Sequence, residues 1–194
     1  MESHGQPINW RRAFLSGAAG TLLMLAFIDF CNLAGLTPFS MERYLGSVFY
    51  TGSSASHWTL GFFVNLVVGG LLSVFYAYNF EYVFRHSGVG LGTRLGFGHA
   101  VIAALFVFPF FGVIHDQLGT GVQFGFFGAA LGVATPIILL AAHLMYGACV
   151  GLFYGPVRNE RIRALYSEPG EVGLSARMRG VITPDEDPVD AAYT

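Results

Sequence analysis

The sequence predicts an all-helical integral membrane protein, a bundle of four transmembrane helices. Of its 194 residues, 54% are hydrophobic and only 11% are charged, and its mean hydropathy is +0.56. Soluble domains carry roughly 25% charged residues, so an ordinary soluble fold is excluded. Four apolar stretches have about the length that a helix needs to cross a hydrocarbon layer of roughly 30 Å. They are residues 13–36, 58–83, 95–115 and 136–154.

The first predicted helix, residues 13–36, follows Arg11 and Arg12. The stretch RRAFLSGAAGTLLMLAF has the two arginines and the apolar core of a twin-arginine export signal. However, no A-x-A-like cleavage site follows, and the remaining chain is membrane-embedded, which leaves no soluble domain to export. We therefore expect an uncleaved helix that the two arginines anchor.

Short interfacial helices or re-entrant turns are expected in both outer connections. After the first helix, Pro38 and Ser40 can start a short amphipathic helix before the Gly- and Ser-rich residues 51–56. Before the fourth helix, residues 116–135 are apolar but too short and too rich in glycine for another span.

The third predicted helix, residues 95–115, contains a proline and a histidine. Pro109 has no amide hydrogen, so the carbonyl of Leu105 is expected to lack its helical donor. His99 lies near the inner end, as Glu81 does on the second helix. We assign these two residues to a charged and aromatic membrane interface and give them no chemistry.

The distribution of arginine predicts the orientation. The chain has no lysine, which indicates GC-rich coding and hence a bacterial source. Arg43 alone borders the predicted outer side, whereas seven arginines border the other side. Because cytoplasmic loops carry the excess of positive charge, both termini are expected in the cytoplasm of a cell with an inner membrane. The seven are Arg11, Arg12, Arg85, Arg94, Arg158, Arg161 and Arg163.

Two parts are expected, a transmembrane domain over residues 1–157 and a polar, largely disordered cytoplasmic tail over residues 158–194. The net charge is −2 and no basic run is present, so a nucleic-acid partner is excluded. The expected partners are the lipid bilayer and a second copy of the chain or another membrane protein. No cofactor is expected.

Small residues recur every four positions on two of the predicted helices. Gly147, Gly151 and Gly155 follow His143 on the fourth helix, and glycine at this spacing lets another helix approach closely. Packing within one chain is favoured over packing between chains. The series on the second helix is His57, Gly61, Asn65, Gly69, Ser73 and Ala77.

Polar side chains from three helices are predicted to share one layer. Asp29, Asn65 and His143 each lie roughly 10 Å below the outer boundary at about 1.5 Å per residue, and Asn32 lies one turn from Asp29. An unpaired carboxylate at that depth costs about 2.5–3.5 kcal/mol on insertion scales, so His143 is the expected partner of Asp29. Such a cluster can hold helices together, conduct protons or substrate, or bind a metal.

A second polar group lies at helix ends nearer the outer surface. His57, His115 and Asp116 could together coordinate a transition metal. No H-x-x-x-H or H-E-x-x-H spacing supports this, and polar residues at a membrane interface explain the pattern equally well. His57 and His115 are also the only pair near a common depth for a bis-histidine haem.

Three stretches resemble the loose group of uncharacterised small bacterial inner-membrane proteins that includes the YagU-like proteins. They are SGAAGTLLML, HWTLGFFVNLVVGGLLSVFYAY and TPIILLAAHLMYGACVGLFYG, so the resemblance covers about residues 12–157. It implies a four-span inner-membrane protein and carries over no functional residue, because the group has no established catalytic site.

The sequence thus favours a non-enzymatic structural or accessory protein packed through its glycine stripes. The alternative is a small proton-coupled transporter or channel that uses an Asp29–His143 pair. A membrane metal-binding protein comes third. Measuring both the stability and the transport phenotype of Asp29→Asn and His143→Ala separates the first two functions. Metal analysis of the purified protein tests the third.

Overall fold

The computed structural model describes residues 8–50, 53–120 and 122–158, and no strand occurs in these parts of the chain. Four helices are long and apolar enough to cross a membrane, which confirms that prediction. The predicted tail lies outside the described residues except for Arg158. The elements are α1 (Trp10–Leu33), α2 (Met41–Phe49), α3 (Ser54–Tyr78), η1 (Asn79–Phe84), α4 (Val89–Ile102), η2 (Ala103–Val107), α5 (Phe108–Gln117), η3 (Phe126–Leu131) and α6 (Thr135–Tyr154).

The first helix starts and ends three residues earlier than predicted, for local reasons. Asn9 caps its start, because its side-chain oxygen accepts the amide of Arg12 at 2.9 Å. Gly35 has φ +73° beyond its end, and the amide of Leu36 turns back to the carbonyl of Cys31 at 3.0 Å. This left-handed glycine ends the helix before the apolar residues of the stretch do.

The third span begins at Val89, six residues before the predicted start, and it is not a uniform α-helix. Its middle, η2, is a π-helical turn in which the amide of Phe108 reaches the carbonyl of Ala103. Pro109 lies two residues after this turn. A π-turn shifts the hydrogen-bond pattern at the point where the proline removes a donor, so α4, η2 and α5 continue as one rod.

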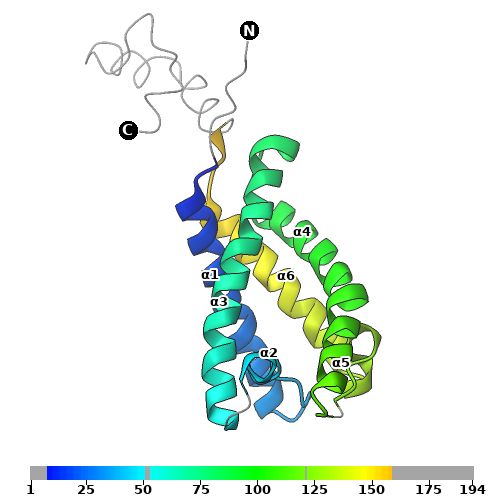
Figure 1. Ribbon diagram of the computed structural model, residues 1–194. Helices are drawn as coiled ribbons and strands as arrows, with labels where there is room; N and C mark the ends of the chain where they lie inside the picture. Colours follow the sequence, from blue (N-terminus) through cyan, green and yellow to red (C-terminus); the bar gives the residue numbers. More distant parts are fainter. Residues whose placement is uncertain (1–7, 51–52, 121, 159–194) are drawn as a thin grey trace, which may run out of the picture.

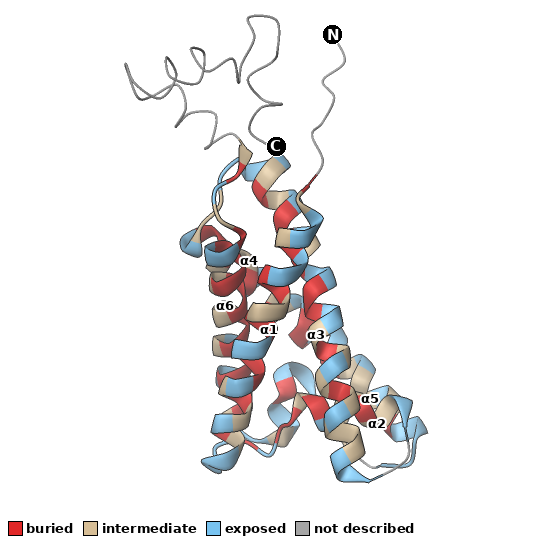
Figure 2. Ribbon diagram, turned by 90° about the vertical axis from the view of Figure 1, so that its left-hand side faces the viewer, coloured by how far each residue is buried: buried red, intermediate tan, exposed pale blue. Residues whose placement is uncertain are grey.

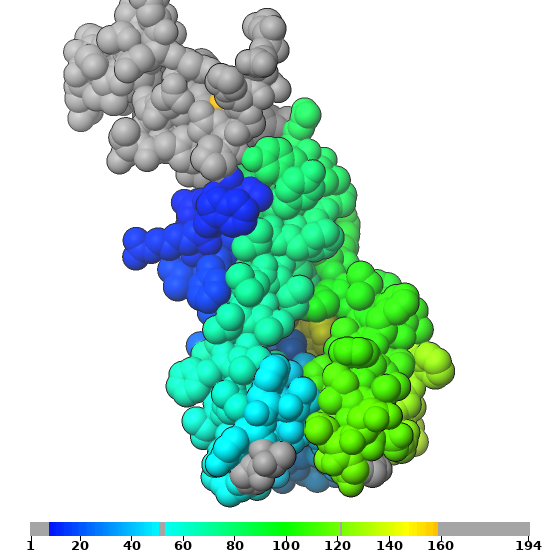
Figure 3. Space-filling view, viewed as in Figure 1, coloured from blue at the N-terminus to red at the C-terminus, as the bar shows by residue number. Residues whose placement is uncertain are grey.

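The four spans pack in the order α3, α1, α6, α4, and α2 packs along α3 (Figure 1). The two ends of the described chain lie at one end of the bundle, whereas α2, the end of α5 and η3 lie at the other. Buried residues follow the inner faces of the helices (Figure 2). On the face shown in Figure 3, α3, α4 and α5 largely cover α6.

Glycine lets α4 and α6 approach to backbone contact. A Cβ atom on Gly92 or on Gly147 would overlap the carbonyl oxygen of the other residue. Gly96 lies in the same way against the carbonyl of His143, and Gly151 against that of Gly88. Two glycines of the predicted stripe on the fourth helix therefore pack inside one chain.

The third glycine of that stripe has another role. Gly155 follows the last residue of α6 with φ +70°, and a Cβ atom there would meet the guanidinium of Arg12. It ends the helix in a conformation that suits glycine and does not pack against α4.

The stripe on α3 packs against α1. Gly69 lies against the hydroxyl of Thr21, and Gly17 lies against the carbonyl of Gly69. One turn further along α3, the hydroxyl of Ser73 donates to the carbonyl of Ala13. The small residues that the sequence placed at helix contacts therefore join α1 to α3.

Candidate functional site

The predicted polar layer is divided between separate places in the bundle. Asp29 lines a small cavity of about 120 Å³ together with Asn32, Arg43 and Trp58. The amide of Asn32 donates to the carbonyls of Thr37 at 3.0 Å and Phe39 at 3.3 Å, and so holds the chain that leaves α1. The structure therefore brings Asp29 and Asn32 together.

Asn65 and His143 bond within their own helices instead. The amide of Asn65 donates to the carbonyl of Gly61 at 2.9 Å, and Nδ1 of His143 donates to the carbonyl of Leu139 at 2.7 Å. Among the described residues, no hydrogen bond links Asp29 to His143. His143 instead lines a different cavity from Asp29.

The direct neighbour of His143 is His99, a residue that the sequence pattern links to no chemistry. The two ring centroids are 4.9 Å apart and the ring planes meet at 87°. The hydroxyl of Tyr76 lies 3.2 Å from Nδ1 of His99, and Tyr146 packs on both, at 5.7 Å from His99 and 5.5 Å from Tyr76. Four rings from α3, α4 and α6 thus form one cluster, in which His99 is partly buried and the other three are buried.

Helical spacing could have found His99. Gly92, Gly96 and His99 are spaced by four and then three residues, so His99 continues the face of α4 that packs on α6. Its place near a predicted helix end suggested an interface instead. The predicted helix starts at residue 95, after the true start at Val89, because the glycine-rich start of α4 resembles a loop.

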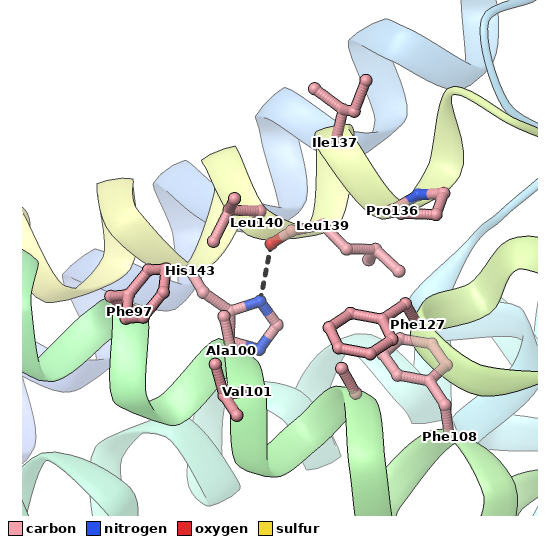
Figure 4. Close-up of a pocket in the computed structure, with 11 residues that line it drawn as sticks. Phe97, Ala100, Val101, Phe108, Phe127, Pro136, Ile137, Leu139, Leu140 and His143 are labelled. Atoms are coloured by element: carbon pink, nitrogen blue, oxygen red, sulfur yellow. Dashed lines mark hydrogen bonds between the residues drawn. The ribbon is translucent and has the colours of Figure 1, made fainter.

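A larger cavity of about 370 Å³ lies beside this cluster, between α4, α5, η3 and α6 (Figure 4). His143 is the single polar side chain among the described residues that line it. Three phenylalanines and small or aliphatic side chains form the rest of the wall. They include Phe97, Phe108, Phe127, Ala100, Ala104 and Ile137.

The cavity is open on the outside of the bundle. Phe97, Phe127, Ile137 and Leu140 line it and are themselves exposed. On its inner side, α4 and α6 close together where Gly96 meets the backbone of His143. The space is therefore a pocket in the side of the protein, with an imidazole at its closed end.

The contact of His143 with Leu139 determines which ring nitrogen carries the proton. A carbonyl oxygen only accepts hydrogen bonds, so the contact with Leu139 places the ring proton on Nδ1. Nε2 then has a lone pair in the neutral ring and has no hydrogen-bond partner among the described residues. The side chain is only 7% exposed, and the ring lies between α6 and α4 at the cavity (Figure 4).

The structure does not assemble the three residues considered for an outer metal. Nδ1 of His115 bonds to the carbonyl of Phe111 at 2.9 Å, and Nε2 lies 3.1 Å from the hydroxyl of Ser47. His57 packs on Tyr50, and Asp116 lines a separate outer cavity. In the described parts of the chain, no three His, Cys, Asp or Glu side chains are grouped for a metal.

Glu42, on α2, is a buried acid that the sequence did not single out. Its side chain is 0% exposed, Oε2 accepts the hydroxyl of Ser40 at 3.2 Å, and Oε1 has no hydrogen-bond partner. Burial raises the pKa of Glu42 above its ordinary value, and the charge of Asp29 raises it further. Its burial is tertiary, because its backbone lies against Gly61 of α3.

Glu81 joins two helices at the other end of the bundle. Oε1 accepts the hydroxyl of Tyr154 at 2.8 Å, and Oε2 accepts the amide of Arg158 at 3.2 Å. Arg12 lies over the ring of Tyr154, 5.4 Å from its centroid. An acid assigned to a membrane interface is thus also a structural anchor for the end of α6.

No protein-family model, curated protein or solved structure matches this chain. The resemblance to the YagU-like group stays a prediction, and the function is inferred from the cavity and its surroundings.

Proposed function

We propose that this chain is a non-enzymatic accessory protein of the bacterial inner membrane that holds a membrane-dissolved, apolar molecule in the cavity beside His143. The observation that carries the proposal is a cavity of about 370 Å³ whose walls are apolar and whose mouth lies on the outside of the bundle. Small-molecule sites typically measure about 300–1,000 Å³ and combine apolar walls with few polar groups. A ligand that reaches this mouth comes from the hydrocarbon of the bilayer.

The packing around the cavity supports a binding role. Along α4 and α6, glycines bring the backbones together at Gly92 and Gly147. Further along the span that contains α4, Ala100 of α4 and Ala104 of η2 line the cavity, and their small side chains leave it open. The two helices are thus joined firmly at one end of their contact and leave room at the other.

The glycine stripes contribute to this role by building the pocket. Gly92, Gly147 and Gly69 make their contacts inside one chain. The transport alternative rested on a pair of Asp29 and His143, and the two residues have different neighbours in the bundle. Ligand binding is therefore the better supported of these functions.

We place both termini in the cytoplasm. The support is that the described ends of the chain lie at one end of the bundle (Figure 1). Arg11 and Arg12 belong to the first turn of α1, and Arg158 follows α6. Alkaline phosphatase fused after Gln117 is expected to be active in the periplasm, and the same enzyme fused after Arg158 is expected to be inactive. The reverse result would overturn this orientation.

Filling the cavity tests the binding role. Ala104→Leu adds three carbons inside the cavity, and the matched control Ala26→Leu adds them to an exposed position on α1. Native mass spectrometry of the purified proteins should show a bound apolar molecule on the wild type and on the control, and should show it lost from Ala104→Leu. An equal amount of bound molecule on all three proteins would contradict the proposal.

A further inference from the structure

The closed end of the His143 cavity offers a hydrogen-bond acceptor. Nδ1 of His143 is committed to the carbonyl of Leu139, so the neutral ring presents the lone pair of Nε2. This atom has no hydrogen-bond partner among the described residues, although the side chain is more than nine-tenths buried. His143 is also the single polar side chain among the described residues that line the cavity, so a molecule that enters meets no other side-chain acceptor there.

The neutral ring is the form that the cavity favours. No carboxylate is among the described residues that line the cavity, so an imidazolium there would be a buried charge without a partner. Its aromatic neighbour His99 is held by the hydroxyl of Tyr76 and presents no negative charge either. Nε2 of this neutral ring is therefore an acceptor.

We infer that the molecule bound in this cavity is a neutral lipid with a hydroxyl group, which donates its O–H to Nε2 of His143. This inference rests on the binding function proposed above and names the chemical class of the ligand. The apolar remainder of the molecule would lie against Phe97, Phe108 and Phe127 and leave through the open side of the cavity into the bilayer. A lipid carbonyl cannot take the place of the hydroxyl, because it has no proton to donate.

The depth of His143 narrows the class further. It lies eight residues after the start of α6 at Thr135, about 12 Å along the helix at roughly 1.5 Å per residue. A charged headgroup at that depth would lose its hydration, and the described wall offers no charged side chain to compensate. Long-chain alcohols, diacylglycerols, quinols and protonated fatty acids share a neutral O–H that can reach this depth.

His99 has a supporting role as a positioning residue. Its ring lies edge-on against His143 at 4.9 Å, so it limits rotation of the imidazole away from the cavity. Gly96 allows this arrangement, because it brings α4 against the backbone of His143 itself. The acceptor is thus fixed in direction before a ligand arrives.

Two probes that differ only at the donor test the inference. We would measure the binding of radiolabelled 1-hexadecanol and of hexadecyl methyl ether to the full-length protein in lipid nanodiscs. The ether keeps the chain and the oxygen but has no proton to donate. One hydrogen bond in such a site predicts that the alcohol binds about threefold to tenfold more tightly.

Variants locate the preference at His143. In His143→Leu, the alcohol and the ether should bind equally, at the affinity of the ether. The control His86→Leu changes an exposed histidine that does not line the cavity, so this variant should keep the preference for the alcohol. Mass spectrometry of the lipid extracted from purified wild type then identifies which hydroxyl lipid is bound.

The outcomes separate this inference from the proposed function. Equal binding of the two probes to wild type would overturn the hydroxyl inference and leave the binding function standing. The absence of binding by either probe, together with no effect of Ala104→Leu on the bound molecule, would overturn both. A preference for the alcohol that persists in His143→Leu would also overturn the inference.

Discussion

The imidazole of His143 lies edge-on against that of His99, with ring centroids 4.9 Å apart and planes at 87°. One ring comes from α6 and the other from α4, at the level where Gly96 lies against the backbone of His143. Edge-to-face pairs contribute about 0.5–1.5 kcal/mol beyond the area that they bury. The contact therefore links the packing of two helices to the closed end of the cavity.

A double-mutant cycle measures this link. We expect His99→Ala and His143→Ala to lower the free energy of unfolding with a coupling energy of about 0.5–1.5 kcal/mol, because each removes the same ring contact. Reversible unfolding in mixed micelles provides the measurement. The control pair His99→Ala and His115→Ala should add within about 0.5 kcal/mol. Additivity in the first pair would show that the ring contact contributes nothing.

The glycines of α4 give a second prediction. A Cβ atom on Gly92 would overlap the backbone of Gly147, so Gly92→Ala should lower the free energy of unfolding by about 1–3 kcal/mol. Gly98 lies on the same helix with nothing within 4 Å of its position for a Cβ atom. Gly98→Ala should therefore be neutral or stabilising by up to about 1 kcal/mol. Thermal melts of both variants in detergent test the contrast, and a similar loss in both would contradict it.

Two tyrosine hydroxyls that donate hydrogen bonds to different acceptors give a third prediction. Tyr146 donates to the carbonyl of Gly69 at 2.5 Å, and Tyr154 donates to the carboxylate of Glu81 at 2.8 Å. Hydrogen bonds to charged groups contribute about 1.5–3 kcal/mol, against about 0.5–1.5 for neutral pairs. Tyr154→Phe should therefore cost more than Tyr146→Phe in the free energy of unfolding. An equal or larger loss in Tyr146→Phe would contradict this order.

The stability should also depend on pH through Glu42. Burial raises the pKa of Glu42 in the folded protein, so the folded state keeps its proton where the unfolded state has lost it. Stability should then fall as the pH rises from about 4.3, the ordinary glutamate value, up to the raised value, by at most about 1.4 kcal/mol per pH unit.

Glu42→Gln is the matching test, because glutamine has the shape of the protonated acid and does not ionise. Unfolding measured across this pH range should show a shallower dependence in Glu42→Gln than in wild type. The control Asp116→Asn, at an exposed carboxylate, should leave the dependence unchanged. Identical profiles for wild type and Glu42→Gln would show that the buried carboxyl has no part in it.

The four long helices could be predicted because their signal is local. Each depends on a run of apolar residues of sufficient length, which the sequence contains whatever the rest of the chain does. The predicted helix ends differ from the observed ones where helix packing or a single turn residue determines the end. Gly35 ends α1 early, and the glycine-rich stretch after Gly88 becomes helix because Gly92 meets Gly147 from a different part of the chain.

Gly69, Ser73, Gly147 and Gly151 lie at helix contacts, and their spacing is visible in the sequence because residues four apart share a helix face. Counting residues along a helix gives the depth of a side chain and not its direction around the bundle. Asp29 and His143 were therefore assigned similar depths, yet they line different cavities.

By itself the sequence determined the class of protein, the number of long apolar helices and the faces on which small residues recur. Only the tertiary structure decided which side chains meet: His143 with His99, Asp29 with Arg43 and Trp58, and Glu81 with Tyr154. The physical reason is that length and apolarity act along one helix, whereas these contacts depend on the order and rotation of helices that are distant in the chain.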